Sequence, residues 1–226
     1  MVAASKENFI VNDRPAVTTT EKLIRHVRLA RALHWLMAIC VLSLLSTALL
    51  PIMGVKFSWV TIHWVTGLVL VVAALIHIFW SLLWQRLRQM VFGFRDFKDT
   101  FRTLAWFLRI SRQEPAKPGK YSPAQKLLHH TFAIIIIASI VTGLLMMVKI
   151  DTPIWERNPY WLSAAAWGVI YVIHDLAAML LVTVIMLHIY FAIRPEKRLY
   201  LRSMVLGWIT RTEYASHHDT DRWENK

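Results

Sequence analysis

The chain has 226 residues, of which 56% are hydrophobic, and its mean hydropathy is +0.43. This composition excludes an ordinary soluble domain and indicates an integral membrane protein. The formal net charge is +12, but the basic residues are grouped between apolar stretches. That grouping is typical of membrane topology and argues against nucleic acid as a partner.

Four apolar stretches follow one another along the chain. Runs of 24, 29 and 22 residues without Asp, Glu, Lys or Arg lie between Arg31 and Lys56, between Lys56 and Arg86, and between Lys126 and Lys149. A fourth stretch, which ends before Arg194, contains Asp175 as its one charged residue. A helix of about 20 residues crosses the hydrocarbon core of a bilayer. The sequence therefore predicts an all-α integral membrane protein, a four-transmembrane-helix bundle with spans at about 32–53, 60–84, 127–148 and 166–192.

The 26 Lys and Arg residues predict the orientation of these spans. Six precede the first span, ten lie between Gln85 and Lys126, and seven follow Ile193, which leaves three for the other two loops. Because Lys and Arg gather on the cytoplasmic side, both termini and the central loop are predicted to be cytoplasmic. No apolar segment typical of a signal peptide precedes Arg31, so the first span is expected to direct insertion.

The segments outside the spans are expected to have different characters. Residues 1–20 are expected to be disordered, and residues 21–31 to form a basic lead-in helix. Residues 21–210 form the predicted membrane domain, followed by a cytoplasmic tail at 211–226. In the central loop Phe97, Phe101, Leu104 and Leu108 recur at helical spacing. This pattern predicts a cytoplasmic amphipathic helix between spans 2 and 3, either at the membrane interface or packed on the protein.

Five of the ten histidines lie inside the apolar stretches: His34, His63, His77, His174 and His188. Ionisable side chains are costly in a bilayer, so each is a functional candidate. His174 and His188 are fourteen residues apart. On a helix that separation is about 21 Å and nearly four turns, so the two imidazoles share one face at two depths.

Histidines at two depths of one membrane bundle are typical of a protein that holds two haems. An iron with two imidazole ligands needs one histidine from each of two facing helices at the same depth. Depth pairs His63 with His174 near the outer side, and His34 with His188 near the cytoplasmic side. His77 lies fourteen residues after His63 and competes with His34 for the inner iron. Hydrogen bonding between helices is the alternative role for such histidines.

Other metal chemistry is less favoured by the sequence. No three or four metal ligands converge at short spacing, which argues against a zinc site. Cys40 is the single cysteine, so this chain alone cannot hold an iron–sulfur cluster or a covalently attached haem. Asp175, beside His174, is expected either to orient that imidazole or to pair with Arg157.

Several motifs carry a resemblance to a known family. They are His34-Trp35, His63 with Gly67, the segment GKYSPAQK at 119–126, His174 with His188, and the tail residues Gly207, Arg211, Ala215, His217-His218 and Arg222-Trp223. From about Lys22 to Trp223 the chain resembles the cytochrome b (gamma) subunit of membrane-bound formate dehydrogenases. More distantly, it resembles the cytochrome b subunits of nickel–iron hydrogenases.

The resemblance implies specific roles for residues of this chain. It implies that His34, His63, His174 and His188 ligate two haem b groups, and it favours His34 over His77 at the inner iron. It also implies a quinone site near the inner haem, with Ser122 and Gln125 as polar contacts, although Ser122 stands where the family usually has Asn. His77 and the His129-His130 pair face the same inner zone, as proton relays, as contacts of haem propionates, or as ordinary interfacial histidines.

The predicted function is that of a di-haem membrane anchor of a respiratory formate dehydrogenase in the bacterial inner membrane. Electrons are expected to come from an iron–sulfur subunit on the outer face and to reach membrane quinone, while a separate catalytic dehydrogenase subunit oxidises the substrate. One alternative is the anchor of a hydrogenase, thiosulfate reductase or other periplasmic oxidoreductase. A remote alternative is a haem-free histidine transporter of protons or metal ions.

Overall fold

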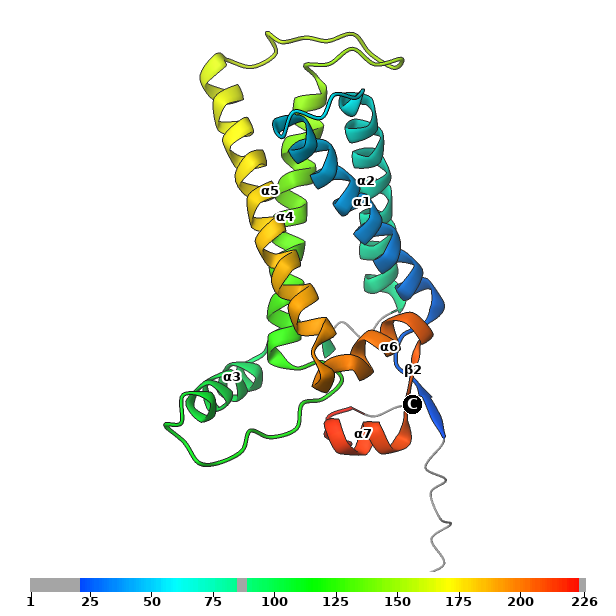
Figure 1. The fold of residues 1–226 in the computed structure, drawn as a ribbon, viewed down its shortest axis with the longest axis vertical. Helices are drawn as coiled ribbons and strands as arrows, with labels where there is room; N and C mark the ends of the chain where they lie inside the picture. Colours follow the sequence, from blue (N-terminus) through cyan, green and yellow to red (C-terminus); the bar gives the residue numbers. More distant parts are fainter. Residues whose placement is uncertain (1–20, 85–88, 224–226) are drawn as a thin grey trace, which may run out of the picture.

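The computed structural model describes residues 21–84 and 89–223, so the predicted disordered segment 1–20 lies outside the described residues. Within them, the chain forms four helices long and apolar enough to cross a membrane (Figure 1). These are α1 (Arg28–Ile52), α2 (Trp59–Trp84), α4 (Pro123–Met147) and α5 (Ala164–Ile193). The predicted four-helix membrane bundle is confirmed, and each helix overlaps one predicted span over nearly its whole length.

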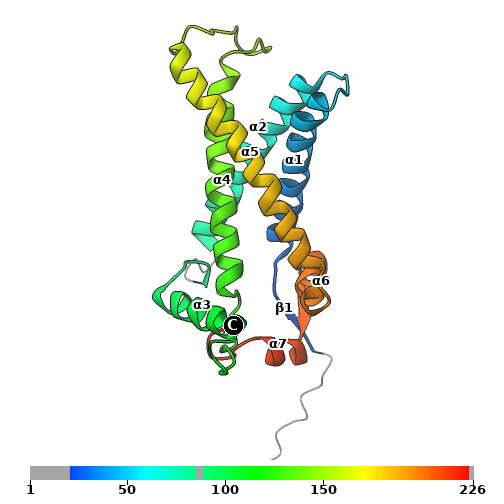
Figure 2. The ribbon, with the colours of Figure 1, turned by 60° about the vertical axis from the view of Figure 1, so that its left-hand side comes forward.

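The four long helices form two hairpins. The most extensive contacts lie within the hairpins, between α1 and α2 and between α4 and α5. Figure 2 shows α5 running obliquely, from beside α4 at one end of the bundle toward α1 at the other. Only 11% to 17% of the apolar stretch in each long helix is buried inside the protein. Most side chains of these stretches are therefore available for contact with lipid.

A packed apolar belt fills the middle of the bundle. Its buried members come from all four long helices and are Cys40, Val41, Leu70, Ile135, Ala177, Leu181 and Val184. On α5 the residues Ala177, Leu181 and Val184 follow His174 at helical spacing and precede His188. The belt therefore separates two levels of histidine along one helix face.

Residues 21–27 and 195–223 form what we call the terminal layer, below one end of the spans (Figure 1). It contains β1 (Lys22–Ile24), η2 (Pro195–Lys197), α6 (Arg198–Leu206), β2 (Trp208–Thr210) and α7 (Arg211–His217). β1 pairs antiparallel with β2, with Lys22 opposite Thr210. The predicted lead-in helix over 21–31 is therefore wrong, because its first residues form a strand and α1 begins only at Arg28. The connections 53–58 and 148–163 lie at the opposite end, which we call the loop end.

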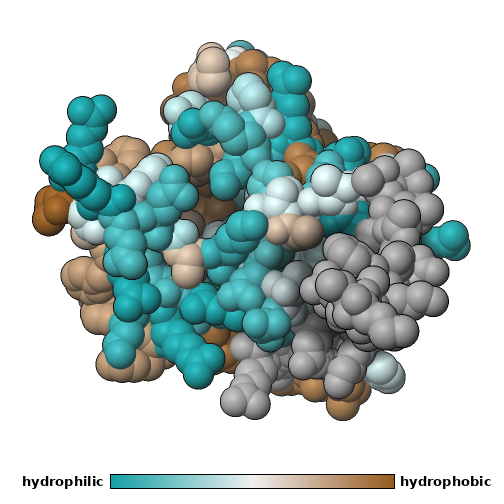
Figure 3. Space-filling model, turned by 90° about the horizontal axis from the view of Figure 1, so that it is seen from below, coloured by the Kyte–Doolittle hydropathy of each residue, from teal (hydrophilic) through white to brown (hydrophobic). Residues whose placement is uncertain are grey.

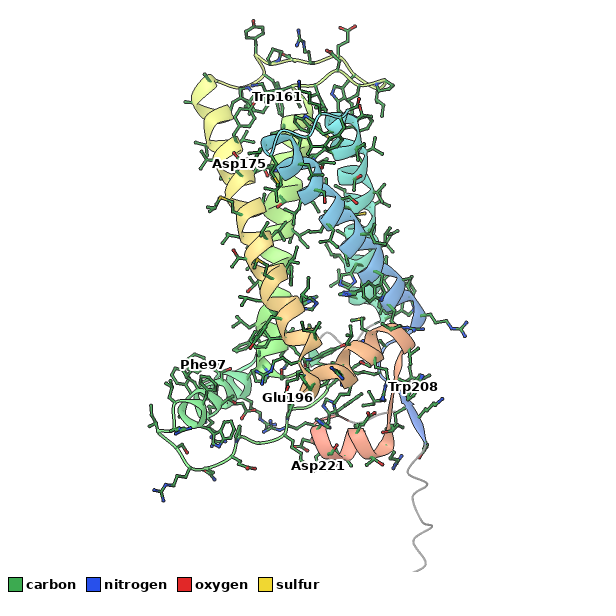
Figure 4. All side chains as sticks on the ribbon, in the orientation of Figure 1. Phe97, Trp161, Asp175, Glu196, Trp208 and Asp221 are labelled. Carbon is green, nitrogen blue, oxygen red and sulfur yellow. The ribbon has the colours of Figure 1, made fainter. Side chains whose placement is uncertain are left out.

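The central loop contains α3 (Phe94–Phe107), which is the predicted amphipathic helix. Phe94 and Phe107 are each 75% exposed, so the apolar face of α3 is not covered by the described part of the protein. Figure 4 shows Phe97 on this helix, beside the terminal layer. A partly buried ion pair ties α3 to the bundle, since Nζ of Lys126 on α4 lies 2.9 Å from Oδ2 of Asp96. Proximity to the span ends agrees with a helix at the membrane interface.

Candidate functional site

The outer pair of histidines faces across the bundle at the loop end. His63 lies in the second turn of α2 and His174 lies on α5, and their ring centres are 6.3 Å apart. A metal–nitrogen bond of about 2 Å, with each ring centre about 1.1 Å farther out, places the centres of two imidazoles on opposite sides of one iron about 6.2 Å apart. The observed separation therefore fits a single iron held by both rings.

Two threonines orient the outer pair. Oγ1 of Thr47 on α1 lies 2.8 Å from Nδ1 of His63, and Oγ1 of Thr142 on α4 lies 2.8 Å from Nδ1 of His174. Thr47 donates its hydroxyl proton to the carbonyl of Leu44, and Thr142 donates its proton to the carbonyl of Ala138. Each threonine oxygen is thus left to accept a hydrogen bond from an imidazole Nδ1–H.

These hydrogen bonds select the tautomer of both rings. With the proton fixed on Nδ1, the lone pair of Nε2 is free to bind a metal. The two hairpins use the same arrangement. In each hairpin, the threonine of the first helix orients the histidine of the second. Sequence reasoning missed both threonines, and their separations from the histidines, 16 and 32 residues, give no local signal.

The inner pair lies near the terminal layer. His34 in the second turn of α1 and His188 near the end of α5 have ring centres 6.3 Å apart, the same separation as the outer pair. Trp35 packs at 5.4 Å from His34, and Phe132 packs at 5.7 Å from His188. The oblique course of α5 explains why one helix supplies both levels, one facing α2 and the other facing α1 (Figure 2).

His77, which competes with His34 on depth alone, faces a different partner. Its ring centre lies 6.2 Å from that of His129 on α4. Nδ1 of His77 is buried without a hydrogen-bond partner, whereas Nδ1 of His130 bonds to the carbonyl of Lys126. The described residues thus contain a third imidazole pair with similar spacing, on α2 and α4, while His34 is the residue that faces His188.

Ser122 and Gln125 lie together at the start of α4. The backbone N–H of Ser122 donates to Oε1 of Gln125 at 2.9 Å, and the backbone N–H of Gln125 donates to Oγ of Ser122 at 3.3 Å. This reciprocal arrangement is a capping box that satisfies the first turn of the helix. Among the described residues, the amide nitrogen of the Gln125 side chain has no hydrogen-bond partner, so it remains free to contact a ligand.

Asp175 makes neither of the two contacts expected for it. Arg157 forms its ion pair with Asp151 in the connection before α5, at 3.7 Å, and not with Asp175. Thr142, and not Asp175, accepts the hydrogen bond from His174. Figure 4 shows Asp175 on α5 toward the loop end of the bundle. The carboxylate is therefore not the group that orients the imidazole beside it.

Comparison with known proteins gives one consistent result. A family described as prokaryotic cytochrome b561 matches residues 25–207. The cytochrome b556 subunit of formate dehydrogenase from Haemophilus influenzae is 25% identical over 224 residues, which covers 92% of this chain and 84% of that protein. The cytochrome b556(fdo) subunit of formate dehydrogenase from Escherichia coli (strain K12) is 24% identical over 214 residues, which covers 90% of this chain and 92% of that protein.

Proposed function

This chain belongs to the prokaryotic cytochrome b561 family, and from that premise we propose that it is the di-haem cytochrome b subunit of a membrane-bound formate dehydrogenase. The family implies haem b as the cofactor. The names of the relatives support formate dehydrogenase as the parent complex. We assign residues 21–210 to the di-haem membrane domain and residues 211–226 to a cytoplasmic tail.

One observation carries the proposal: two imidazole pairs with ring centres 6.3 Å apart lie at two levels of one apolar bundle. His63 and His174 would hold the outer haem iron, and His34 and His188 would hold the inner one. When bound, the two haems supply one-electron carriers at two depths of the membrane. The apolar belt around Leu181 keeps the levels apart and excludes water between them.

The inner level is the proposed side of quinone reduction. It lies beside the terminal layer, and most Lys and Arg residues flank that end of the spans, which supports a cytoplasmic position for both termini. Ser122 and Gln125, at the start of α4 on the same side, are the proposed polar contacts of the quinone. The loop end then faces the iron–sulfur subunit that delivers electrons from the catalytic dehydrogenase subunit.

The experiment that tests this function is a dithionite-reduced minus oxidised visible spectrum of the purified chain, with haem measured as pyridine haemochrome. About two b haems per chain are expected, one for each imidazole pair. Absence of haem would refute the proposal and favour the histidine transporter. Reduction of the haems by formate in the intact complex, with hydrogen gas as the control donor, separates a formate dehydrogenase from a hydrogenase.

The threonines that orient the outer pair give a second test. Thr142→Val removes the acceptor of the His174 Nδ1–H, so we expect the outer haem to bind about 10- to 100-fold more weakly. Thr142→Ser keeps the hydroxyl and is expected to restore binding. Haem titration of the apoprotein measures the affinity. The matched control is Ser139→Ala on the same helix, because the Ser139 hydroxyl bonds to the carbonyl of Ile135. Equal losses of haem affinity in Thr142→Val and Ser139→Ala would contradict the role of Thr142.

A further inference from the structure

Arg25 is a buried cation without a carboxylate partner. Its side chain is 2% exposed, and its two terminal nitrogens donate to Nε2 of His218 at 2.8 Å and to the carbonyl of Lys120 at 2.7 Å. The guanidinium carbon lies 4.8 Å from the ring centre of Tyr200 and 5.2 Å from that of Trp223. Nε of Arg25 is buried and has no hydrogen-bond partner.

His218 does not compensate the charge of Arg25. Arginine only donates, so Nε2 of His218 accepts, and Nδ1 donates to the carbonyl of Gly119 at 2.7 Å. Burial lowers the pKa of His218 to about 4, although the bond to Gly119 acts in the opposite direction. The ring is therefore neutral near pH 7 and leaves Arg25 with its full positive charge.

Arg31 brings a second cation to the same place. It precedes His34 by three residues on α1, so both side chains lie on one helix face, with Arg31 one turn closer to the terminal layer. Its Nη1 donates to the carbonyl of Val205, and its guanidinium packs so closely over Gly207 that a Cβ there would lie 3.1 Å from Nε. Nε of Arg31 is also buried without a hydrogen-bond partner.

Lys120 and His26 show that these charges converge. Burial, with the charge of Arg25, lowers the pKa of Lys120 to about 8, so the amine is still mostly charged near pH 7. The pKa of His26 is lowered to about 3, first by burial and then by the charges of Arg25, Lys120, His34 and Arg31. His26 thus lies inside a region of positive potential that adjoins the inner histidine pair. Figure 3 shows the hydrophilic residues that gather on this end of the molecule.

No carboxylate of the described residues forms an ion pair with Arg25, Arg31 or Lys120. Buried charges without counter-ions are strongly unfavourable, and buried nitrogens without acceptors are rare in folded proteins. The uncompensated charge of the buried Arg25, with Arg31 and Lys120 nearby, therefore indicates an anion that belongs to the working protein. Guanidinium groups bind carboxylates with two parallel hydrogen bonds, which makes a carboxylate a suitable anion.

We propose that Arg25, Arg31 and Lys120 bind the propionate carboxylates of the haem held between His34 and His188. This inference rests on the proposed function. A haem in an apolar bundle must direct its carboxylate edge toward polar groups, and Arg31 lies one helical turn beyond His34 on α1. Arg25 and Lys120 share the neighbour His26 with Arg31 and His34. The terminal layer then does more than join the two ends of the chain, because it holds Arg25 and Lys120 in place around the anion.

The test is the midpoint potential of each haem in the purified full-length chain. Arg31→Gln and Lys120→Gln each remove a positive charge beside the inner haem, which disfavours its reduced state. We expect the reduction equilibrium of the inner haem to fall about tenfold, equivalent to about 59 mV for one electron, with the outer haem unchanged. The two potentials are assigned by comparison with His174→Ala. Arg28→Gln is the matched control, because Arg28 is an exposed residue in the first turn of α1.

Two results would overturn the inference while leaving the proposed function intact. One is an inner-haem potential in Arg31→Gln and Lys120→Gln equal to that of Arg28→Gln, with both haems bound. The other is a wild-type inner-haem potential that shifts with added inorganic phosphate and loses this response in Lys120→Gln, which would identify free phosphate as the anion. Absence of haem from the wild-type chain would refute the proposed function itself and the inference with it.

Discussion

Replacing His174 with alanine is expected to remove the outer haem and leave the inner haem in place. The substitution deletes one of two iron ligands at the loop end, while the inner pair lies beyond the apolar belt and fourteen residues farther along α5. Pyridine haemochrome should fall from about two haems per chain to about one. One of the two components of a redox titration should disappear, and the other should keep its potential.

The control for this loss is Asp175→Asn. It alters the adjoining residue of the same helix, whose carboxylate does not bond to the imidazole of His174, so both haems should remain. His63→Ala is expected to remove the same haem as His174→Ala. The His63→Ala/His174→Ala double variant should then lose no more haem than either single variant. If the two single variants lost different haems, or if either kept both, the outer pair would be wrongly assigned.

The spans could be predicted because their cause is local. A helix must remain apolar and nearly free of charge for about 20 residues to cross the hydrocarbon core, and that requirement is visible in a linear sequence. The observed helices extend past the predicted spans at several ends, as at Arg28 in α1 and Pro123 in α4. Charged and polar residues can continue a helix into the interface, so an absence of charge marks the membrane and not the helix end.

The terminal layer could not be predicted, because its cause is remote in sequence. β1 and β2 have three residues each, too few for a periodic pattern, and the partner of Lys22 is Thr210 near the other end of the chain. The basic residues between 21 and 31 suggested a helix at the membrane surface. Burial of Arg25 among Tyr200, Trp223 and His218 depends on contacts that no local rule describes.

The sequence predicted the depth of each site histidine in the membrane, but not which histidine faces which. Helical spacing on α5 placed His174 and His188 at two levels, and the structure brings each of them against one of the expected partners. Depth alone left His34 and His77 equivalent, because both lie near the same end of the bundle. Their separation depends on whether α1 or α2 faces the lower half of α5, which is a property of the packed helices.

The difference between those two histidines makes a sharp prediction for the inner haem. His34→Ala is expected to remove one haem per chain, because His188 then has no imidazole opposite it. His77→Ala is the matched control, an intramembrane histidine at similar depth whose ring faces His129 on α4. It should keep both haems. Haem content and redox titration of the two variants, purified side by side, measure the difference.

The proposed inner haem borders the proposed quinone site, so its loss is expected to have a second consequence. In the intact complex, His34→Ala should still allow formate to reduce the outer haem, but quinone reduction should fall to the background rate. His77→Ala should preserve both steps if His77 ligates no iron. Loss of a haem from His77→Ala would instead show that the pair of His77 and His129, with ring centres 6.2 Å apart, holds iron. The inner iron would then be held between α2 and α4, and His34 would no longer be its assigned ligand.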